Sequence, residues 1–424
     1  MRENPKIRPS TAIGLVVRRF CAIGLLVATG VLSGCVSAPA PAPKIATPAP
    51  KPQPPTTMAR HPLTGEQSGF LRLSNLPPGR TPVRVGVLLP FSNGSASTRL
   101  LAASMLKAAE MALFDSGKHE LLLMTADEGA GGAEAAAGAR MLLSEGAEVI
   151  IGPLFAQSVS AVAPVARDRG VPLISFSTDR AVAGNGVYLL SFQPENQVRR
   201  IVSYAAAQGH SAFAALIPDT AYGARVSAAF HDSVAAAGGH IVDLENFAPE
   251  AGDIAAPAEK IARSKADAVL IAQGGPLLRD IAPTLAANGA SSQQVQYLGT
   301  GLWDDPATAR EPSLSGGWFA APDPDAERGY ETKYRALFGT DPPPLSALAY
   351  DAMSLVALLA SGPPYHRFTW EALTDPDGFS GIDGIFRFDP DGTSDRGLAV
   401  LRIDPGGSFT VISPAPRTFQ PSGS

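Results

Sequence analysis

The chain has 424 residues, of which 45% are hydrophobic, and a formal net charge of −5 at pH 7. This length exceeds one ordinary hydrophobic core and predicts more than one compact lobe. The acidic balance argues against nucleic acid, or the anionic face of a membrane, as a binding partner.

The first 34 residues are predicted to be a targeting segment. A pair of arginines at 18–19 precedes an apolar stretch at 20–31, which is too short to span a bilayer comfortably. The tetrapeptide LSGC at 32–35 follows at once and resembles a bacterial lipobox, which implies cleavage before Cys35 and acylation of that residue. An ordinary signal peptide with a chance cysteine is the alternative. We expect a periplasmic protein anchored to a lipid bilayer through Cys35, and Val36, which is not Asp, favours the outer membrane.

Cleavage would leave a mature chain with a net charge of −9, because the leader carries five basic residues and one acid. With Cys21 removed and Cys35 acylated, the fold would have no disulfide and no cysteine metal site. Residues 35–81 are predicted to be a tether, since eight prolines lie between Pro39 and Pro55 and such a composition favours polyproline II over a packed core. At ~3.1 Å per residue, residues 36–57 would reach roughly 70 Å. Within 35–81, residues 70–73 are a candidate edge strand.

From Val83 onward, short apolar strands alternate with helices, which is the pattern of a parallel α/β sheet. A first series of strands is predicted at 83–89, 121–125, 149–151, 173–176 and 188–192. A second series is predicted at 212–217, 240–247, 268–272, 296–300 and 318–321. The two series predict two lobes.

The stretch GAEVIIGPLFAQSVSAVAPVARDRGVPLISFSTD at 146–179 reads as two buried strands with a helix between them. Its IIGP turn and GVPLISFST strand resemble the type I periplasmic solute-binding fold, in particular the leucine/isoleucine/valine-receptor-like superfamily. Further matches are RVGVLLPFS at 84–92, AALIPDTAYG at 214–223, ADAVLIAQGG at 266–275, VQYLGTGLW at 295–303 and LSALAYDAMSLVALL at 345–359. The resemblance covers residues 83–414.

This resemblance implies an α/β, two-lobed fold in which each lobe is a parallel sheet with helices on both faces. It also implies three crossings between the lobes, which we place near Glu195, Asp325 and Ile382. Lobe 1 is then 82–195 plus 326–381, lobe 2 is 196–325 plus 382–414, and 415–424 is a tail.

Enzyme motifs begin in several places and none is complete. GHSAF at 209–213 lacks the last glycine of a nucleophile elbow, and HELLL at 119–123 lacks the second histidine of a zinc motif. GAGG at 129–132 is followed by Glu134 where a dinucleotide fingerprint needs glycine. DPDGTSD at 389–395 lacks the spacing and the distal glutamate of an EF-hand. We therefore expect a non-enzymatic protein with no catalytic residue, no cofactor and no metal.

Candidate ligand residues follow the predicted strands, because the carboxyl ends of parallel strands line the ligand crevice. In lobe 1 they are Phe155, Ala156, Gln157, Ser158, Ser177, Thr178 and Asp179. The first four lie at a helix N-terminus, which favours an anion, and helix capping is the alternative for the serines and the aspartate. In lobe 2 they are Asp219, Tyr222, Gln273, Gly274, Trp303 and Asp304. Tyr222 matches a family position that closes over ligand, while Trp303 either stacks on a ligand or packs at the hinge.

The chain departs from the amino-acid receptors of this superfamily at three positions. Those receptors present hydroxyls to the α-carboxylate where this chain has Ala156 and Asp179, and an acid to the α-ammonium where it has Leu277. An unpaired buried charge is costly, so an amino-acid zwitterion is a poor candidate ligand.

The lipobox, the tether and the altered pocket together resemble the penicillin-binding protein activator lipoproteins. That resemblance predicts a docking module that reaches a penicillin-binding protein, a murein synthase, in cell-wall synthesis. The better-known members carry a helical-repeat domain where this chain has only the tether. The alternative is the substrate-binding receptor of an ABC importer for an amino acid or a related small polar solute.

Overall fold

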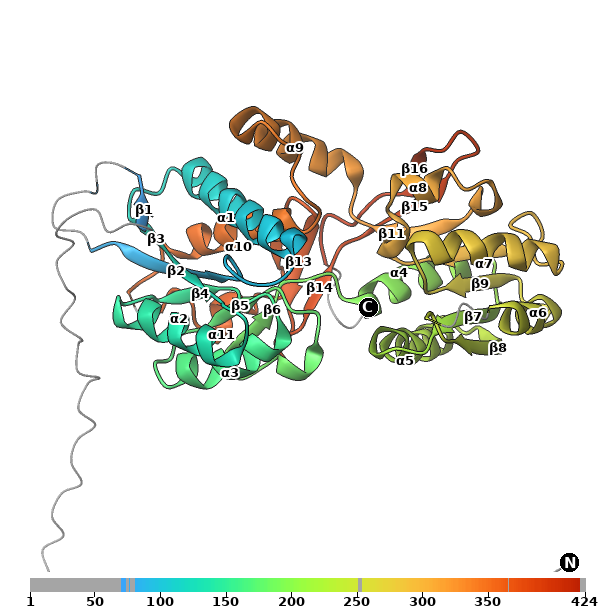
Figure 1. Cartoon of the computed structure of the whole chain (residues 1–424), viewed down its shortest axis with the longest axis horizontal. Helices are drawn as coiled ribbons and strands as arrows, with labels where there is room; N and C mark the ends of the chain where they lie inside the picture. Colours follow the sequence, from blue (N-terminus) through green and yellow to red (C-terminus); the bar gives the residue numbers. More distant parts are fainter. Residues whose placement is uncertain (1–69, 74–75, 77–80, 251–253, 365, 420–424) are drawn as a thin grey trace, which may run out of the picture. The chain divides into compact units, whose positions relative to one another are not determined.

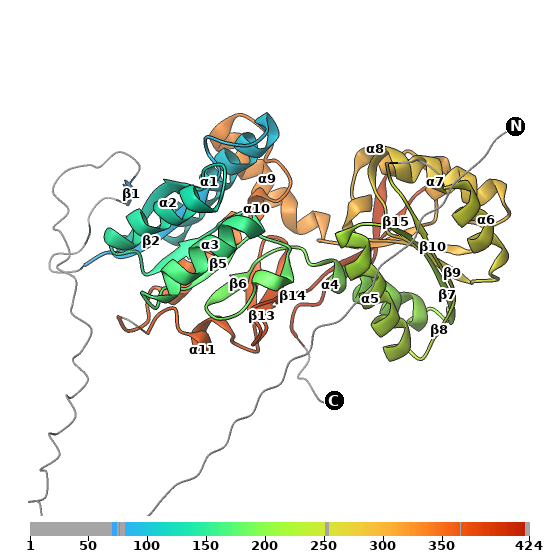
Figure 2. The ribbon, with the colours of Figure 1, turned by 60° about the horizontal axis from the view of Figure 1, so that its bottom comes forward.

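The computed structural model describes residues 70–73, 76, 81–250, 254–364 and 366–419. The predicted signal peptide, Cys35 and nearly all of the tether lie outside the described residues. In the part of the chain that is described, no helix is long and apolar enough to cross a membrane. This part forms two lobes, each built on one main sheet (Figures 1 and 2).

The sheet of the first lobe has six strands in the order β1-β3-β2-β4-β5-β6. Its strands are β1 (Phe70–Arg72), β2 (Val83–Leu89), β3 (Leu121–Asp127), β4 (Val149–Ile151), β5 (Leu173–Ser175) and β6 (Val187–Leu189). Every residue of β2 is buried, because β3 and β4 flank it in parallel and helices cover both faces. The candidate edge strand at 70–73 is confirmed as β1, which pairs antiparallel with β3.

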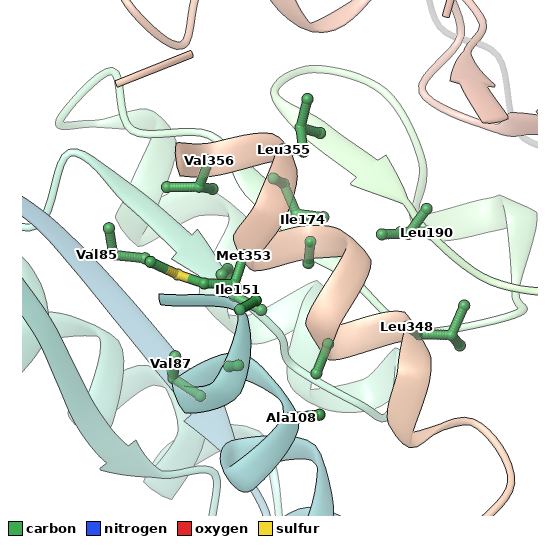
Figure 3. Packing of buried hydrophobic residues seen from close by; sticks show 14 of the residues in the cluster. Val85, Val87, Ala108, Ile151, Ile174, Leu190, Leu348, Met353, Leu355 and Val356 are labelled. Atoms are coloured by element: carbon green, nitrogen blue, oxygen red, sulfur yellow. The ribbon is translucent and has the colours of Figure 1, made fainter. Parts of the chain in front are cut away.

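Helices cover both faces of this sheet. They are α1 (Ala96–Ser116), α2 (Gly132–Ser144), α3 (Ala156–Arg167), α9 (Pro324–Phe338), α10 (Ser346–Leu359) and α11 (Trp370–Leu373), with a 3-10 turn, η1, at Arg180–Val182. Helices α1 and α10 share one core cluster with alternate residues of β2, and α2 and α3 share another with Leu88 of the same strand. The helices of this lobe are labelled in Figure 1. In Figure 3, Met353 of α10 lies close to Val85 and Ile151 of the strands.

The sheet of the second lobe has seven strands in the order β16-β15-β11-β10-β9-β7-β8. Its strands are β7 (Ala212–Pro218), β8 (His240–Phe247), β9 (Ala268–Ile271), β10 (Gln296–Gly299), β11 (Trp318–Ala321), β15 (Ala399–Ile403) and β16 (Phe409–Ser413). Its helices are α4 (Pro194–Ala207), α5 (Ala221–Ala236), α6 (Ala255–Arg263), α7 (Gly275–Ala287) and α8 (Pro306–Ala309), with 3-10 turns η2 (Gly301–Trp303) and η3 (Pro312–Leu314).

The strands of this second sheet alternate between two cores. Phe213, Ala215 and Ile217 of β7 pack with α4 and α5, while Ala214 and Leu216 pack with α6 and α7. These two pairs of helices lie on opposite faces of the sheet (Figure 2). The predicted two-lobed α/β fold is therefore confirmed, with one refinement. Both sheets are mixed, because β1 in the first lobe and β15 and β16 in the second run antiparallel to their neighbours.

The chain crosses between the lobes three times. The first crossing lies between β6 and α4, and the second between β11 and α9, close to the predicted positions. The third crossing was predicted near Ile382, and this position is wrong, because a small antiparallel sheet of the first lobe follows it. The strands of this sheet are β12 (Phe379–Gly381), β13 (Gly384–Phe388) and β14 (Ser394–Arg396). Its phenylalanines pack into the core of the first lobe. Residues 382–396 therefore belong with the first lobe, and the chain enters the second at Leu398.

The contact between α10 and the first sheet gives a test of this core. Met353→Ala should lower the free energy of unfolding by about 2–5 kcal/mol, because the fully buried side chain leaves a cavity that its neighbours fill only in part. Leu358→Ala on the same helix, at a side chain that is 63% exposed, should change it by less than about 0.5 kcal/mol. Chemical denaturation of both variants measures the difference, and equal losses would contradict the packing of α10.

Candidate functional site

A cavity of about 770 Å³ is lined by residues of both lobes. Its walls are formed by the segments that follow β5, β6, β7 and β10, by α9, and by the turn before α10. The carboxyl ends of parallel strands thus meet at the cavity, as expected for an open α/β sheet. The polar and charged lining residues are Thr178, Asp179, Ser191, Gln197, Tyr222, Arg225, Asp304, Glu327, Tyr330, Glu331, Ser346 and Asp383.

The second lobe contributes Tyr222 in the first turn of α5. Thr220 caps this helix, its hydroxyl accepting from the Gly223 N–H at 3.1 Å, and so fixes the first turn. The Tyr222 hydroxyl lies 2.8 Å from Thr300 Oγ1. Burial raises the pKa of Tyr222 to about 12, so this phenol is neutral at physiological pH.

Arg225, one turn further along α5, connects this helix to segments at the first crossing. Its Nε and Nη2 donate to the two carboxylate oxygens of Glu195 at 2.9 and 2.6 Å. Nη2 also donates to Gln193 Oε1, and Nη1 donates to the backbone carbonyl of Thr178 in the first lobe. One guanidinium therefore joins both lobes beside the cavity, in a fork geometry that lysine does not reproduce.

Carboxylates dominate the opposite wall. Glu327 and Glu331 lie one turn apart on α9, Asp383 follows β12, and Asp304 follows η2 in the second lobe. Burial, together with repulsion from Asp383, Asp304 and Glu331, raises the pKa of Glu327. Glu327 also shares a hydrogen bond with Asp383, so the two carboxyl groups hold a proton between them at neutral pH.

Arg396 supports this wall from behind. Its Nη1 lies 3.5 Å from Asp351 Oδ2 and donates to the backbone carbonyl of Asp383 at 3.3 Å. Asp351 also accepts from the Ile382 N–H at 2.6 Å. Gly381 permits this approach, because a Cβ there would lie 2.3 Å from Asp351 Oδ2.

A buried carboxyl group lies next to the helix N-terminus at 155–158. Glu128, which directly follows β3 and is fully buried, accepts from the N–H groups of Leu154 and Phe155 at 2.8 and 3.1 Å. Burial raises the pKa of Glu128, while these hydrogen bonds and one from Ser158 oppose the shift. Glu128 thus binds the two residues immediately before α3, and the predicted anion preference of the first helical turn stays a prediction.

Four of the predicted ligand residues line the cavity: Thr178, Asp179, Tyr222 and Asp304. Asp179 also accepts from the Ala181 N–H and so caps η1, which confirms the capping alternative, while its role as a ligand residue stays a prediction. The remaining predicted residues lie elsewhere. They are Phe155, Ala156, Gln157, Ser158, Ser177, Asp219, Gln273, Gly274 and Trp303.

Trp303 illustrates why these residues lie outside the cavity. Its ring is fully buried in the core of the second lobe, and its Nε1 donates to the Gln273 carbonyl at 3.0 Å. Of the two predicted alternatives, the structure places Trp303 in packing. Ser177 is buried as well, with its hydroxyl accepting from the Asp179 N–H at 3.1 Å. Leu277 packs against the second lobe's core and does not line the cavity.

Five further lining residues were not predicted from the sequence: Arg225, Glu327, Tyr330, Glu331 and Asp383. Arg225 lies three residues after Tyr222, on the same helix face, so helical spacing was a usable signal. Glu327, Tyr330 and Glu331 share a face in the same way. Asp383 had no such signal, because only the small sheet β12–β14 brings it to the wall.

The fold and the cavity between its lobes define a two-lobed binding protein. The family model described as "Periplasmic binding protein" matches residues 82–408, and the chain belongs to that family. A search of curated proteins found no match to this chain.

Solved structures with the same fold include three informative ones. A branched-chain amino acid ABC transporter protein from Rhodospirillum rubrum has a TM-score of 0.71 and 19% identity, over 78% of this chain and 100% of that one. The LivJ substrate-binding protein of Streptococcus pneumoniae, in complex with isoleucine, has a TM-score of 0.55 and 20% identity, over 79% and 100%. An ABC transporter solute-binding protein from R. palustris, in complex with benzoate, has a TM-score of 0.55 and 19% identity, over 79% and 97%.

The shared proton on Glu327 predicts a pH-dependent stability. A raised pKa means that the folded protein holds the proton more tightly than the unfolded chain, whose ordinary value is 4.5. This contribution is complete below that value and is lost as the pH rises toward the folded pKa. Glu327→Gln, which keeps a neutral side chain, should therefore gain stability relative to the wild type between pH 5 and pH 8. Thermal unfolding at both pH values tests this, with the exposed Glu250→Gln as the control, and parallel profiles for wild type and Glu327→Gln would refute it.

The Arg225 fork predicts a loss of stability on a conservative change. Arg225→Lys should cost about 1–3 kcal/mol, because it leaves the buried Gln193 amide oxygen and part of Glu195 without a donor. Arg263→Lys alters an exposed pair with Glu259 one turn away and should cost less than about 0.5 kcal/mol. Denaturant titration compares the two, and a loss no larger than that of Arg263→Lys would show that the fork does not join the lobes in solution.

Proposed function

We propose that this protein is a periplasmic receptor that binds a small solute between its lobes and delivers it to an ABC importer. The observation that carries the proposal is the cavity of about 770 Å³ lined from both lobes. This volume lies within the range of ~300–1,000 Å³ that is typical of small-molecule sites. The relatives with isoleucine and benzoate bound support a small solute as the cargo.

The way in which the lobes meet supports binding by closure. Thr178, Asp179 and Glu327 of the first lobe face Tyr222 and Asp304 of the second. A solute that contacts both sets binds the closed form better than the open form, and it shifts the population accordingly. An importer can then distinguish loaded from empty receptor. We place the receptor in the periplasm, held at a membrane by the acyl chains of Cys35.

The alternative function, a docking module for a penicillin-binding protein, is supported by the lipobox and the proline-rich tether. It also assumes that the pocket no longer binds a solute. The cavity argues against this assumption, because it has a volume of about 770 Å³ and is lined by a dozen polar or charged side chains. The solved relatives with bound solutes likewise favour the receptor over the activator of a penicillin-binding protein.

A thermal-shift screen of the purified full chain tests the receptor. The screen should cover amino acids, amides, aromatic acids and amines, and at least one compound should raise the unfolding temperature. A ligand in hundredfold excess over its dissociation constant stabilises the folded state by ~2.7 kcal/mol. Tyr222→Ala should abolish the shift, whereas Phe155→Ala, at a side chain that is 46% exposed and outside the cavity, should retain it.

Failure of every solute class in this screen would overturn the receptor proposal. Recovery of a penicillin-binding protein by periplasmic cross-linking, with no solute bound, would establish the docking module in its place.

A further inference from the structure

We propose that the cavity selects an organic cation: an amine or quaternary ammonium group on an apolar body, without a carboxylate. This inference rests on the proposed receptor function and names the class of its solute. It follows from three properties of the cavity, which are its charge, the occupation of its anion-binding groups and the nature of its apolar walls.

The charge of the wall favours a cation. Five carboxyl side chains line the cavity, namely Asp179, Asp304, Glu327, Glu331 and Asp383. Among the described lining residues, Arg225 is the one basic side chain, and Glu195 neutralises it through two hydrogen bonds. One proton shared by Glu327 and Asp383 still leaves the wall with an excess of negative charge. A solute carboxylate would meet repulsion here, and an ammonium group would meet attraction.

The groups that would hold a solute carboxylate are already in use. Just before α3, Glu128 takes the N–H group of Leu154, which lines the cavity, and that of Phe155, which does not. After β5, the Asp179 N–H donates to Ser177 Oγ, and the Asp179 carboxylate takes the Ala181 N–H. Arg225 has committed Nε, Nη1 and Nη2 to acceptors of the chain. An anionic or zwitterionic solute would therefore have to displace an internal partner.

The remaining wall suits an apolar body beside the charge. Phe176, Phe192, Tyr222 and Tyr330 line the cavity together with aliphatic side chains and the three prolines before Leu345. Aromatic faces attract cations, most strongly where water is excluded. Tyr222 is neutral, so its ring adds this attraction without adding a second anion. The cavity thus combines carboxylates with aromatic rings in one lining.

The carboxylates also come from both lobes. Asp304 belongs to the second lobe and repels Glu327 of the first closely enough to raise the pKa of Glu327. A cation bound between them removes this repulsion and contacts both lobes at once. The charge of the solute would therefore stabilise the closed form directly.

A matched series of probes tests the inference by isothermal titration of the purified full chain. The aromatic series is benzylamine, benzamide and benzoate, and the aliphatic series is isoamylamine, leucine and 4-methylvalerate. Phosphate buffer replaces amine buffers, which would compete. In each series we expect the amine to bind at least tenfold more tightly than the other two, and to lose affinity as the salt concentration rises.

Variants separate charge from shape. Glu331→Gln and Asp304→Asn should each weaken the amine about tenfold while leaving the weaker binding of benzamide unchanged, and Glu250→Gln should change neither. Tighter binding of benzoate, 4-methylvalerate or leucine than of the matched amine would overturn the cation inference and leave the receptor standing. Amine binding that neither carboxylate variant alters would overturn it too, because the site would lie elsewhere. Absence of binding throughout this series and the solute screen would overturn both proposals.

Discussion

The cavity wall that contains Asp383 depends on the contacts of the buried Arg396 guanidinium with Asp351 and with the backbone of Asp383. This guanidinium joins Asp351 of α10 to the loop that carries Asp383, and it lies over the rings of Phe192 and Phe386 at 4.9 and 5.4 Å. Removing one partner of a buried ion pair is costly, by ~3–5 kcal/mol, because the other charge stays buried and unpaired. Burial raises the pKa of Asp383 and Arg396 opposes that rise, so the guanidinium favours the ionised form of this carboxyl group.

The position of Arg396 also explains where the first lobe ends. Arg396 is the last residue of β14, and Leu398 already belongs to the core of the second lobe. The third crossing therefore begins at a residue whose side chain is fixed in the first lobe. A hinge needs fixed ends if a movement between the lobes is to be a rotation and not a local unfolding. Arg225 performs the corresponding role at the first crossing, through Glu195 and Gln193.

The N-terminal end of α3 shows how a side chain of this protein can modify a feature of a shared fold. The Glu128 carboxyl group accepts from the N–H groups of Leu154 and Phe155, so it lies beside the end of α3 that favours negative charge. The chain shares its fold with solved receptors at identities near 20%, so the fold does not fix which residues lie at this helix end. Fold membership alone therefore does not name the solute, and the chemistry of the wall has to.

The sequence by itself determined the architecture. Runs such as VRVGVLL and VII are buried strands because β-branched and aliphatic residues at consecutive positions require cover on both faces, and β2 and β4 lie where the sequence placed them. It also located the strand ends around which Thr178, Asp179, Tyr222 and Asp304 gather. Only the tertiary structure decided that Trp303 is enclosed, that Glu128 lies beside the end of α3, and that Asp383 and Glu327 meet. These outcomes depend on contacts between residues far apart in the chain, whereas local periodicity records only which side of its own element a residue occupies.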